Sequence, residues 1–209
     1  MTRPATGIVW SGTEHSLSPE VMATAEQAEQ LLDIAELAIR ARLDGTQHPG
    51  PDVHQLPQHM QQPCGAFVTL HISRQLNGCI GNIDASDPIG ACVARLAVQA
   101  AFEDARFPPL TSADLDVLHI EVSLLSPHAE VPAASRAQLI EQLTPGVDGL
   151  IVASGHHRAV FLPAVWDQLP DPEQFLDQLL RKAGLPTTTW PSDMHAELFT
   201  TESFGRQLR

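Results

Sequence analysis

The stretch CGAFVTLHISRQLNGCIGNI, residues 64–83, holds two runs of apolar and β-branched residues separated by SRQ. The runs, residues 64–72 and 76–83, predict two antiparallel strands joined by a three-residue hairpin loop. The second run places Gly78 and Gly81 around Cys79, although glycine weakens a strand and adds no side chain to it. Two explanations are open: a bulge or close backbone crossing, or space for a molecule to approach the thiol.

Regular alternation divides the second run into two faces. The predicted faces are Asn77, Cys79, Gly81 and Ile83 on one side and Leu76, Gly78 and Ile80 on the other. A reactive cysteine needs a nearby cation, helix N-terminus or histidine to lower its pKa. His71 on the neighbouring strand and Arg106 are the best candidates for that role in the sequence. Free cysteine is also among the most often buried residues, so a structural role for Cys79 stands beside a ligand or nucleophile role.

The first long helix is predicted over residues 18–43, with Ser18 as N-cap and Pro19 in the first helical position. Its apolar residues recur at helical spacing and predict one face packed against a larger body. That stripe consists of Ala28, Leu31, Leu32, Ala35, Ile39 and Leu43. Residues 1–17 show no periodicity, and we expect a flexible N-terminus there.

The middle of the chain predicts a second helix and a third strand. Asp87 and Pro88 open a helix that runs to about residue 104, and the prolines of ARFPPLT end it. Residues 118–124 alternate apolar and polar side chains, which indicates a half-buried strand. Its polar face, His119, Glu121 and Ser123, fits a metal or acid–base site, but any one-sided sheet gives the same pattern.

The C-terminal half predicts a second set of helices and strands. A short helix lies near residues 135–143, and two strands follow within DGLIVASGHHRAVFLP, residues 148–163, with Gly155 and His156 at their turn. A helix from Pro172 to Lys182 ends at Gly184, and residues 195–204 form a final strand. The whole pattern predicts an α+β fold with a mostly antiparallel sheet and packed helices.

Composition narrows the classes of function. The 209 residues include 12 Lys and Arg against 25 Asp and Glu, a net charge of −13, which disfavours nucleic acid as a partner. Three cysteines without C-x-x-C spacing indicate free thiols in a reducing cytoplasm. We see neither a signal peptide nor a membrane span, and no phosphate loop or cofactor motif, so we expect no membrane association, metal or bound cofactor.

The segment EDARFPPLT, residues 103–111, presents Arg106 and Phe107 on a rigid corner. Arg106 can clamp a carboxylate or phosphate group of a small anionic ligand with two hydrogen bonds. It can equally pair with Glu103 or Asp104 and anchor the end of the helix. Trp166 lies among apolar residues, which favours a packing role for it.

Several segments, in this order, resemble the AMMECR domain family, called AmmeMemoRadiSam system protein A in many microbial forms. They are CGAFVTLH, LNGCIGNI, AAFEDARFPPLT, IEVSLLSP, PGVDGLIV and FLPAVWDQLPDPEQFLDQLLRKAGL, with a terminal SF. The resemblance covers roughly residues 20–204. Position 77 departs from it, since the family usually has Leu-Arg-Gly-Cys-Ile-Gly and this chain has Asn77.

The resemblance implies one AMMECR-like domain over residues 18–209, with a large and a small subdomain around a cleft that the Cys79 segment faces. It also implies partners, because microbial relatives are commonly encoded or fused with a Memo-like protein and a radical S-adenosylmethionine enzyme. Two functions therefore stay open: a binding or accessory component for these partners, or an enzyme subunit that acts on a small anionic metabolite. Cys79 and Arg106 are the candidate catalytic residues. The candidate cleft residues are His71, Asn77, Gly78, Ile80, Gly81, Phe107 and Glu121.

Overall fold

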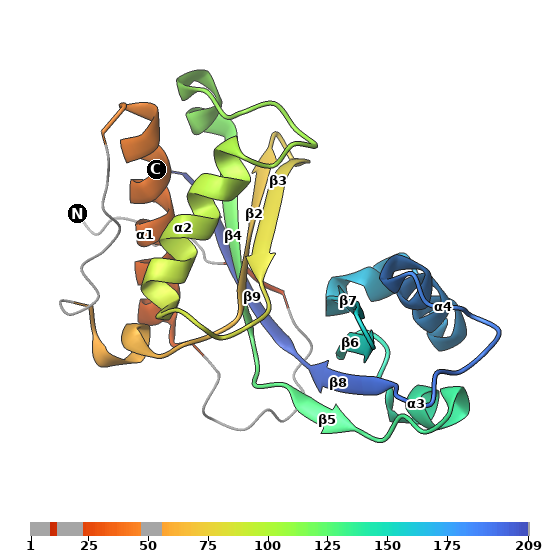
Figure 1. The fold of residues 1–209 in the computed structure, drawn as a ribbon. Helices are drawn as coiled ribbons and strands as arrows, with labels where there is room; N and C mark the ends of the chain where they lie inside the picture. The colour runs from red at the N-terminus through yellow and green to blue at the C-terminus, as the bar shows by residue number, and fades with distance from the viewer. Residues whose placement is uncertain (1–8, 12–22, 47–55, 209) are drawn as a thin grey trace. The chain divides into compact units, whose positions relative to one another are not determined.

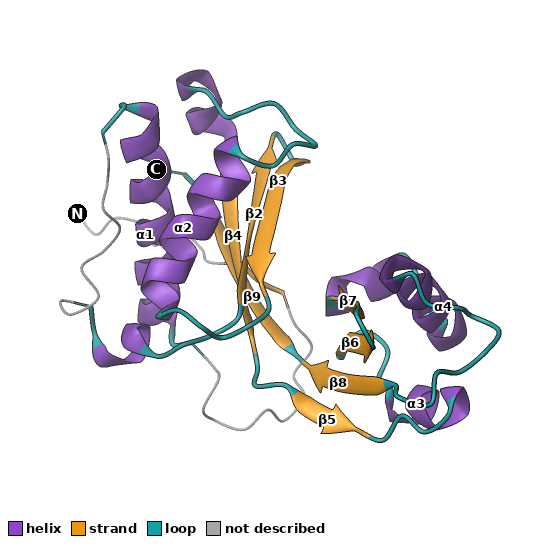
Figure 2. Cartoon of the chain, in the orientation of Figure 1, coloured by secondary structure: helices purple, strands orange, loops and turns teal. Residues whose placement is uncertain are grey.

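The computed structural model describes residues 9–11, 23–46 and 56–208, which fall into two compact units. Unit 1 comprises Met1–Leu125 and Glu202–Arg209, and unit 2 comprises Ser126–Thr201. Each unit combines a sheet with helices, and the strand pairs within them are antiparallel, so the predicted α+β class is confirmed (Figure 2). Among the helices in these ranges, none is both long and apolar enough to span a bilayer.

Unit 1 is a five-stranded sheet in the order β1-β9-β4-β2-β3, with α1 and α2 side by side on one face (Figure 1). Strand β3 is therefore an edge strand. Most of the predicted flexible N-terminus lies outside the described residues, and residues 9–11 pair with β9 as β1. The elements are β1 (Val9–Ser11), α1 (Ala25–Leu43), η2 (Gln58–Gln61), β2 (Ala66–Ile72), β3 (Gln75–Asn82), α2 (Ile89–Phe102), η3 (Ser112–Val117), β4 (Leu118–Leu125) and β9 (Thr201–Gln207).

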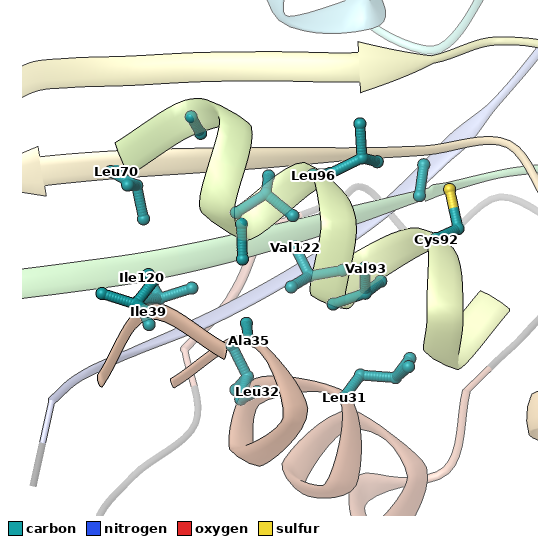
Figure 3. Close-up of a cluster of buried hydrophobic side chains, with 14 of the residues drawn as sticks. Leu31, Leu32, Ala35, Ile39, Leu70, Cys92, Val93, Leu96, Ile120 and Val122 are labelled. Atoms are coloured by element: carbon teal, nitrogen blue, oxygen red, sulfur yellow. The ribbon is translucent and has the colours of Figure 1, made fainter. Parts of the chain in front are cut away.

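The core of unit 1 lies between the two helices and the sheet. Figure 3 shows side chains from α1, α2, β2 and β4 pointing toward one another, and those that it labels are fully or almost fully buried. The predicted stripe of α1 belongs to this core, with Leu43 half-buried beside it. The helix begins later than predicted: Thr24 is its N-cap and forms a capping box with Gln27, while Ser18 lies outside the described residues.

The β2–β3 hairpin differs from the prediction in its turn and its register. Only Ser73 and Arg74 form the turn, both with positive φ (50° and 71°), as a two-residue hairpin of this type requires. The register shifts two residue pairs away from the turn: His71 faces Leu76, but Leu70 faces Gly78, so Asn77 is an extra, bulged residue. The bulge puts Leu76 on the same sheet face as His71, not on the face of Gly78 as alternation predicted.

Unit 2 is a four-stranded sheet in the order β5-β8-β6-β7, covered by its own helices. Trp166 has the packing role predicted for it, because its ring stacks on Phe175 at 3.7 Å and its Nε1 donates to the Asp148 carbonyl at 2.7 Å. The predicted final strand is in fact two strands in two different sheets, β8 here and β9 in unit 1. The elements are β5 (Ala129–Val131), α3 (Arg136–Gln142), β6 (Gly149–Ser154), β7 (His157–Phe161), η4 (Pro163–Asp167), α4 (Pro172–Ala183) and β8 (His195–Phe199).

Candidate functional site around Cys79

Cys79 lies on the face of the unit 1 sheet that is opposite to α1 and α2. It pairs directly with Thr69 of β2, whose hydroxyl donates to the Cys79 sulfur at 3.4 Å. The side chain is half-buried. Without the bulge at Asn77, the register of the turn would have placed Cys79 opposite Val68, which is a core residue. The bulge therefore turns the thiol away from the core and onto the outer face.

Both glycines beside Cys79 are explained by close packing. A Cβ built at Gly78 would lie 2.0 Å from the carbonyl oxygen of Ala100, so the backbone of α2 contacts β3 directly at this residue. A Cβ at Gly81 would lie 2.1 Å from the Phe67 ring, which covers that position. The interpretation that these glycines leave access to the thiol is therefore wrong, and the close-approach explanation is correct.

Asp104 and Arg106 close the outer edge of β3 at Cys79. The Cys79 amide donates to the Asp104 carboxylate at 3.0 Å, and Arg106 Nη2 donates to the Cys79 carbonyl, also at 3.0 Å. The two side chains are joined by hydrogen bonds of 2.9 and 2.6 Å. We call this arrangement the edge clamp. It satisfies backbone groups that an edge strand otherwise leaves unpaired.

Charge is almost neutralised within the edge clamp. Hydrogen bonds from the Arg106 side chain hold the pKa of Asp104 far below its usual range, and they outweigh the burial that would raise it. The same bonds raise the pKa of Arg106. Asp104 is almost fully buried, whereas the Arg106 side chain is 60% exposed and lies over the Phe107 ring at 5.3 Å. Arg106 is thus beside Cys79, with its guanidinium hydrogen-bonded to the main-chain carbonyl, and Phe107 contacts Arg106.

A second group of polar side chains continues across the same sheet face. His71 and His119 are directly opposite each other on β2 and β4, with ring centroids 6.2 Å apart, and Glu121 faces Thr69. Burial lowers the pKa of His119, and His71 adds to this effect while Glu121 opposes it. A Cβ at Gly205 of β9 would lie 2.7 Å from the His119 ring, so glycine makes room for this imidazole.

The predicted site residues do not all share one surface. Cys79, Gly81, His71 and Glu121 belong to the outer face, and Arg106 and Phe107 lie at the edge. Gly78 and Ile80 face α2 and the core instead. The Asn77 side chain has a buried Nδ2 without a hydrogen-bond partner among the described residues.

Two contributors were missed as site residues by sequence reasoning. Thr69 contacts the thiol only because of the bulge, and nothing in the sequence marks Asn77 as an extra residue. Asp104 was considered only as a helix-end partner of Arg106, yet it also binds the Cys79 amide. The position of Asp104, directly after a helix and two residues before Arg106, was the sequence feature that could have marked it as a site residue. Within the described ranges, no group of three or more His, Cys, Asp or Glu side chains is arranged to hold a metal ion.

Comparisons with known proteins show which family the chain belongs to. A family model described as AMMECR1 matches residues 32–204. A protein from Methanothermobacter thermautotrophicus is 37% identical over 163 residues, covering 77% of this chain and 84% of that protein, and one from Methanococcus aeolicus is 34% identical over 172 residues, covering 79% and 83%. The crystal structure of uncharacterized protein PH0010 from Pyrococcus horikoshii matches with a TM-score of 0.79 and 30% identity, covering 90% of this chain and 95% of that one. The chain therefore belongs to the AMMECR1 family.

Proposed function

We propose that this protein is a binding, accessory component that acts with a Memo-like protein and a radical S-adenosylmethionine enzyme. The family resemblance supplies these partners. The observation that carries the accessory role is the edge clamp, because it commits Arg106 to Asp104 and to the Cys79 carbonyl. All three cysteines are unpaired, which supports a cytoplasmic location for this role.

The edge clamp weakens the case for an activated thiol. A thiolate is favoured by a cation or a histidine close to the sulfur. Arg106 is paired with a carboxylate and contacts the main chain of Cys79, and within the described residues no hydrogen bond joins the His71 ring to the sulfur. At position 77 the chain has Asn in place of the usual arginine, and asparagine provides neither the charge nor the bidentate geometry of arginine. A surface that binds a partner fits these features better than a nucleophile.

Anaerobic reconstitution with the two partners tests the proposal. S-adenosylmethionine cleavage and turnover of metabolites should be measured with the complete set of proteins and with this protein omitted. We expect turnover to be lost or reduced at least tenfold on omission. Turnover that is unchanged by omission would reject the partnership.

A second candidate is an enzyme subunit that acts on a small anionic metabolite, with Cys79 as nucleophile or ligand. The observation that favours it is the position of the half-buried sulfur beside the Thr69 hydroxyl, on the sheet face that also carries His71 and Glu121. The exposed part of the Arg106 side chain is the group that would bind the anion. The accessory role and the enzyme subunit differ in one testable respect, which is whether turnover depends on the Cys79 thiol.

A further inference from the structure

Strands β3 and β7 lie at the edges of their sheets, with main-chain groups that point away from the neighbouring strand. Among the described strands, β3 pairs only with β2, and β7 only with β6. Both hairpins have a two-residue turn, so hydrogen bonds join the pair next to the turn and then every second pair of the ladder. With the bulge at Asn77 included, this alternation puts the N–H and C=O groups of Cys79 and of Val160 on the open edges.

An open strand edge is a template for a further strand. A strand pairs with its neighbour through main-chain N–H and C=O groups, so a second copy of the same chain can add its own edge strand there. Proteins protect such edges with charged side chains, bulges or a covering segment. The groups that meet the edges of β3 and β7 therefore decide whether copies of this chain can associate through them.

Two basic side chains meet these edges in the same way. Arg106 Nη2 donates to the Cys79 carbonyl at 3.0 Å, as part of the edge clamp. Lys182 Nζ donates to the Val160 carbonyl, also at 3.0 Å, and we call this contact the lysine cap. Each cation also lies over a phenylalanine ring of its own unit, at 5.3 Å in unit 1 and at 5.2 Å in unit 2. The same device thus occurs once in each sheet.

The edge clamp is the firmer of the two contacts. It satisfies both the N–H and the C=O of Cys79, and its Asp104 is almost fully buried. The lysine cap satisfies a carbonyl alone, and Lys182 is exposed in the last turn of α4, which packs on β7. Strand β3 has eight residues and β7 has five, so the longer edge has the stronger protection. The bulge at Asn77 adds to it, because a bulge also disfavours pairing.

We propose that the edge clamp and the lysine cap prevent β3 and β7 from pairing with an edge strand of a second copy of this chain. An incoming strand has to displace hydrogen bonds that are already made at the middle of each edge. The net charge of −13 opposes association of the copies in general, and the two caps oppose it at the edges. This role concerns copies of this chain alone and is independent of the partners proposed above.

Removal of each cap from the full chain tests this role. The double variant Asp104→Ala with Arg106→Ala frees both main-chain groups of Cys79. Lys182→Ala frees the Val160 carbonyl. Sedimentation velocity over a wide range of protein concentration measures self-association, after circular dichroism has shown that each variant is folded. We expect the association constant of the double variant to rise at least about tenfold above wild type, since two further hydrogen bonds between strands become available, and that of Lys182→Ala to rise less.

Matched controls remove the same charges away from the edges. Asp87→Ala with Arg95→Ala deletes an exposed ion pair, as the double variant deletes the pair of the edge clamp. Arg181→Ala removes a cation from the same turn of α4 as Lys182→Ala. Both controls should associate no more than the wild type. Loss of a single cation makes the net charge more negative and opposes association, so a rise in Lys182→Ala cannot come from charge.

Hydrogen–deuterium exchange locates the contact between copies. As the protein concentration rises, the amides of residues 75–82 should become protected in the double variant, and those of residues 157–161 in Lys182→Ala. A folded variant that associates no more than its control would overturn the proposal, as would association without protection of the uncapped strand. If the double variant does not fold, Lys182→Ala decides alone, because its side chain is exposed.

Discussion

At the scale of single residues, Asn77 decides which way Cys79 points. The extra residue shifts the register so that Cys79 faces Thr69 and the outer surface instead of Val68 and the core. Gly78 and Gly81 then allow α2 and Phe67 to pack closely on the same strand. The position of the thiol is thus set by a bulge and two close contacts, all within a few residues of it.

Alanine substitutions at the two glycines should differ in cost. Gly78→Ala meets the backbone of α2, which cannot move away, and we expect a loss of about 2–3 kcal/mol in the free energy of unfolding. Gly81→Ala meets only the Phe67 side chain and should cost about 1 kcal/mol. Urea unfolding measures both changes. In a Phe67→Ala background, Gly81→Ala should cost less than it does in the wild type, because the clash is removed. Equal costs at the two positions would contradict the packing described here.

Asp104 should make stability depend on acidic pH. Because the pKa of Asp104 is lowered in the folded protein, its contribution is fully present above the unfolded-state value of about 3.9 and is lost as the pH falls below it. Asp104→Asn should cost about 1.5–3 kcal/mol at pH 7, since it removes hydrogen bonds to a charged group. The difference between wild type and variant should shrink as the pH drops from about 5 toward 2. A difference that is independent of pH would mean that the edge clamp is not ionic.

At the scale of elements, a buried arginine attaches α1 to the C-terminal strand. Arg206 of β9 is 4% exposed and binds three carboxylates on successive turns of α1, namely those of Glu29, Asp33 and Glu36. Burial alone would lower the pKa of Arg206, but Asp33 and Glu36 raise it. The helix is thus held by its apolar stripe and by this ionic contact together.

Loss of Arg206 should destabilise the protein more than loss of an exposed arginine. Arg206→Met leaves three carboxylates without their shared cation and should cost about 3 kcal/mol in the free energy of unfolding. Arg206→Lys should recover part of this loss, because it restores the charge but not the planar fork. The matched control is Arg95→Gln, whose ion pair with Asp87 is exposed and should contribute below about 1 kcal/mol. Thermal or urea unfolding measures the ranking, and an equal loss in Arg206→Met and Arg95→Gln would contradict it.

Elements with strong local signals could be predicted from the sequence. The stripe of α1 has helical periodicity, and α4 has an Asp171 cap, Pro172 and a left-handed Gly184, so both helices were recognisable. The hairpin turn was not, because Ser73 and Arg74 adopt positive φ without the glycine or asparagine that usually marks such turns. The bulge likewise depends on contacts with β2 and α2 that a single sequence does not show.

At the scale of the whole molecule, unit 2 is an insertion in unit 1. The chain leaves the first sheet after β4, builds the second sheet, and returns through β9. Residues 195–204 were predicted as one strand because β8 and β9 are separated by Thr200 alone. Which sheet each half joins is decided by pairing partners far away in the sequence. The candidate site around Cys79 belongs entirely to unit 1.

The proposed accessory role means that this protein supports its partners without using Cys79 as a nucleophile. The most direct test is the reconstituted system with Cys79→Ala in place of the wild type, after circular dichroism has shown that the variant is folded. We predict that turnover with Cys79→Ala stays within about twofold of wild type, while omission of the protein abolishes it. Turnover lost with a folded Cys79→Ala variant as completely as on omission would contradict the claim and establish the enzyme subunit instead.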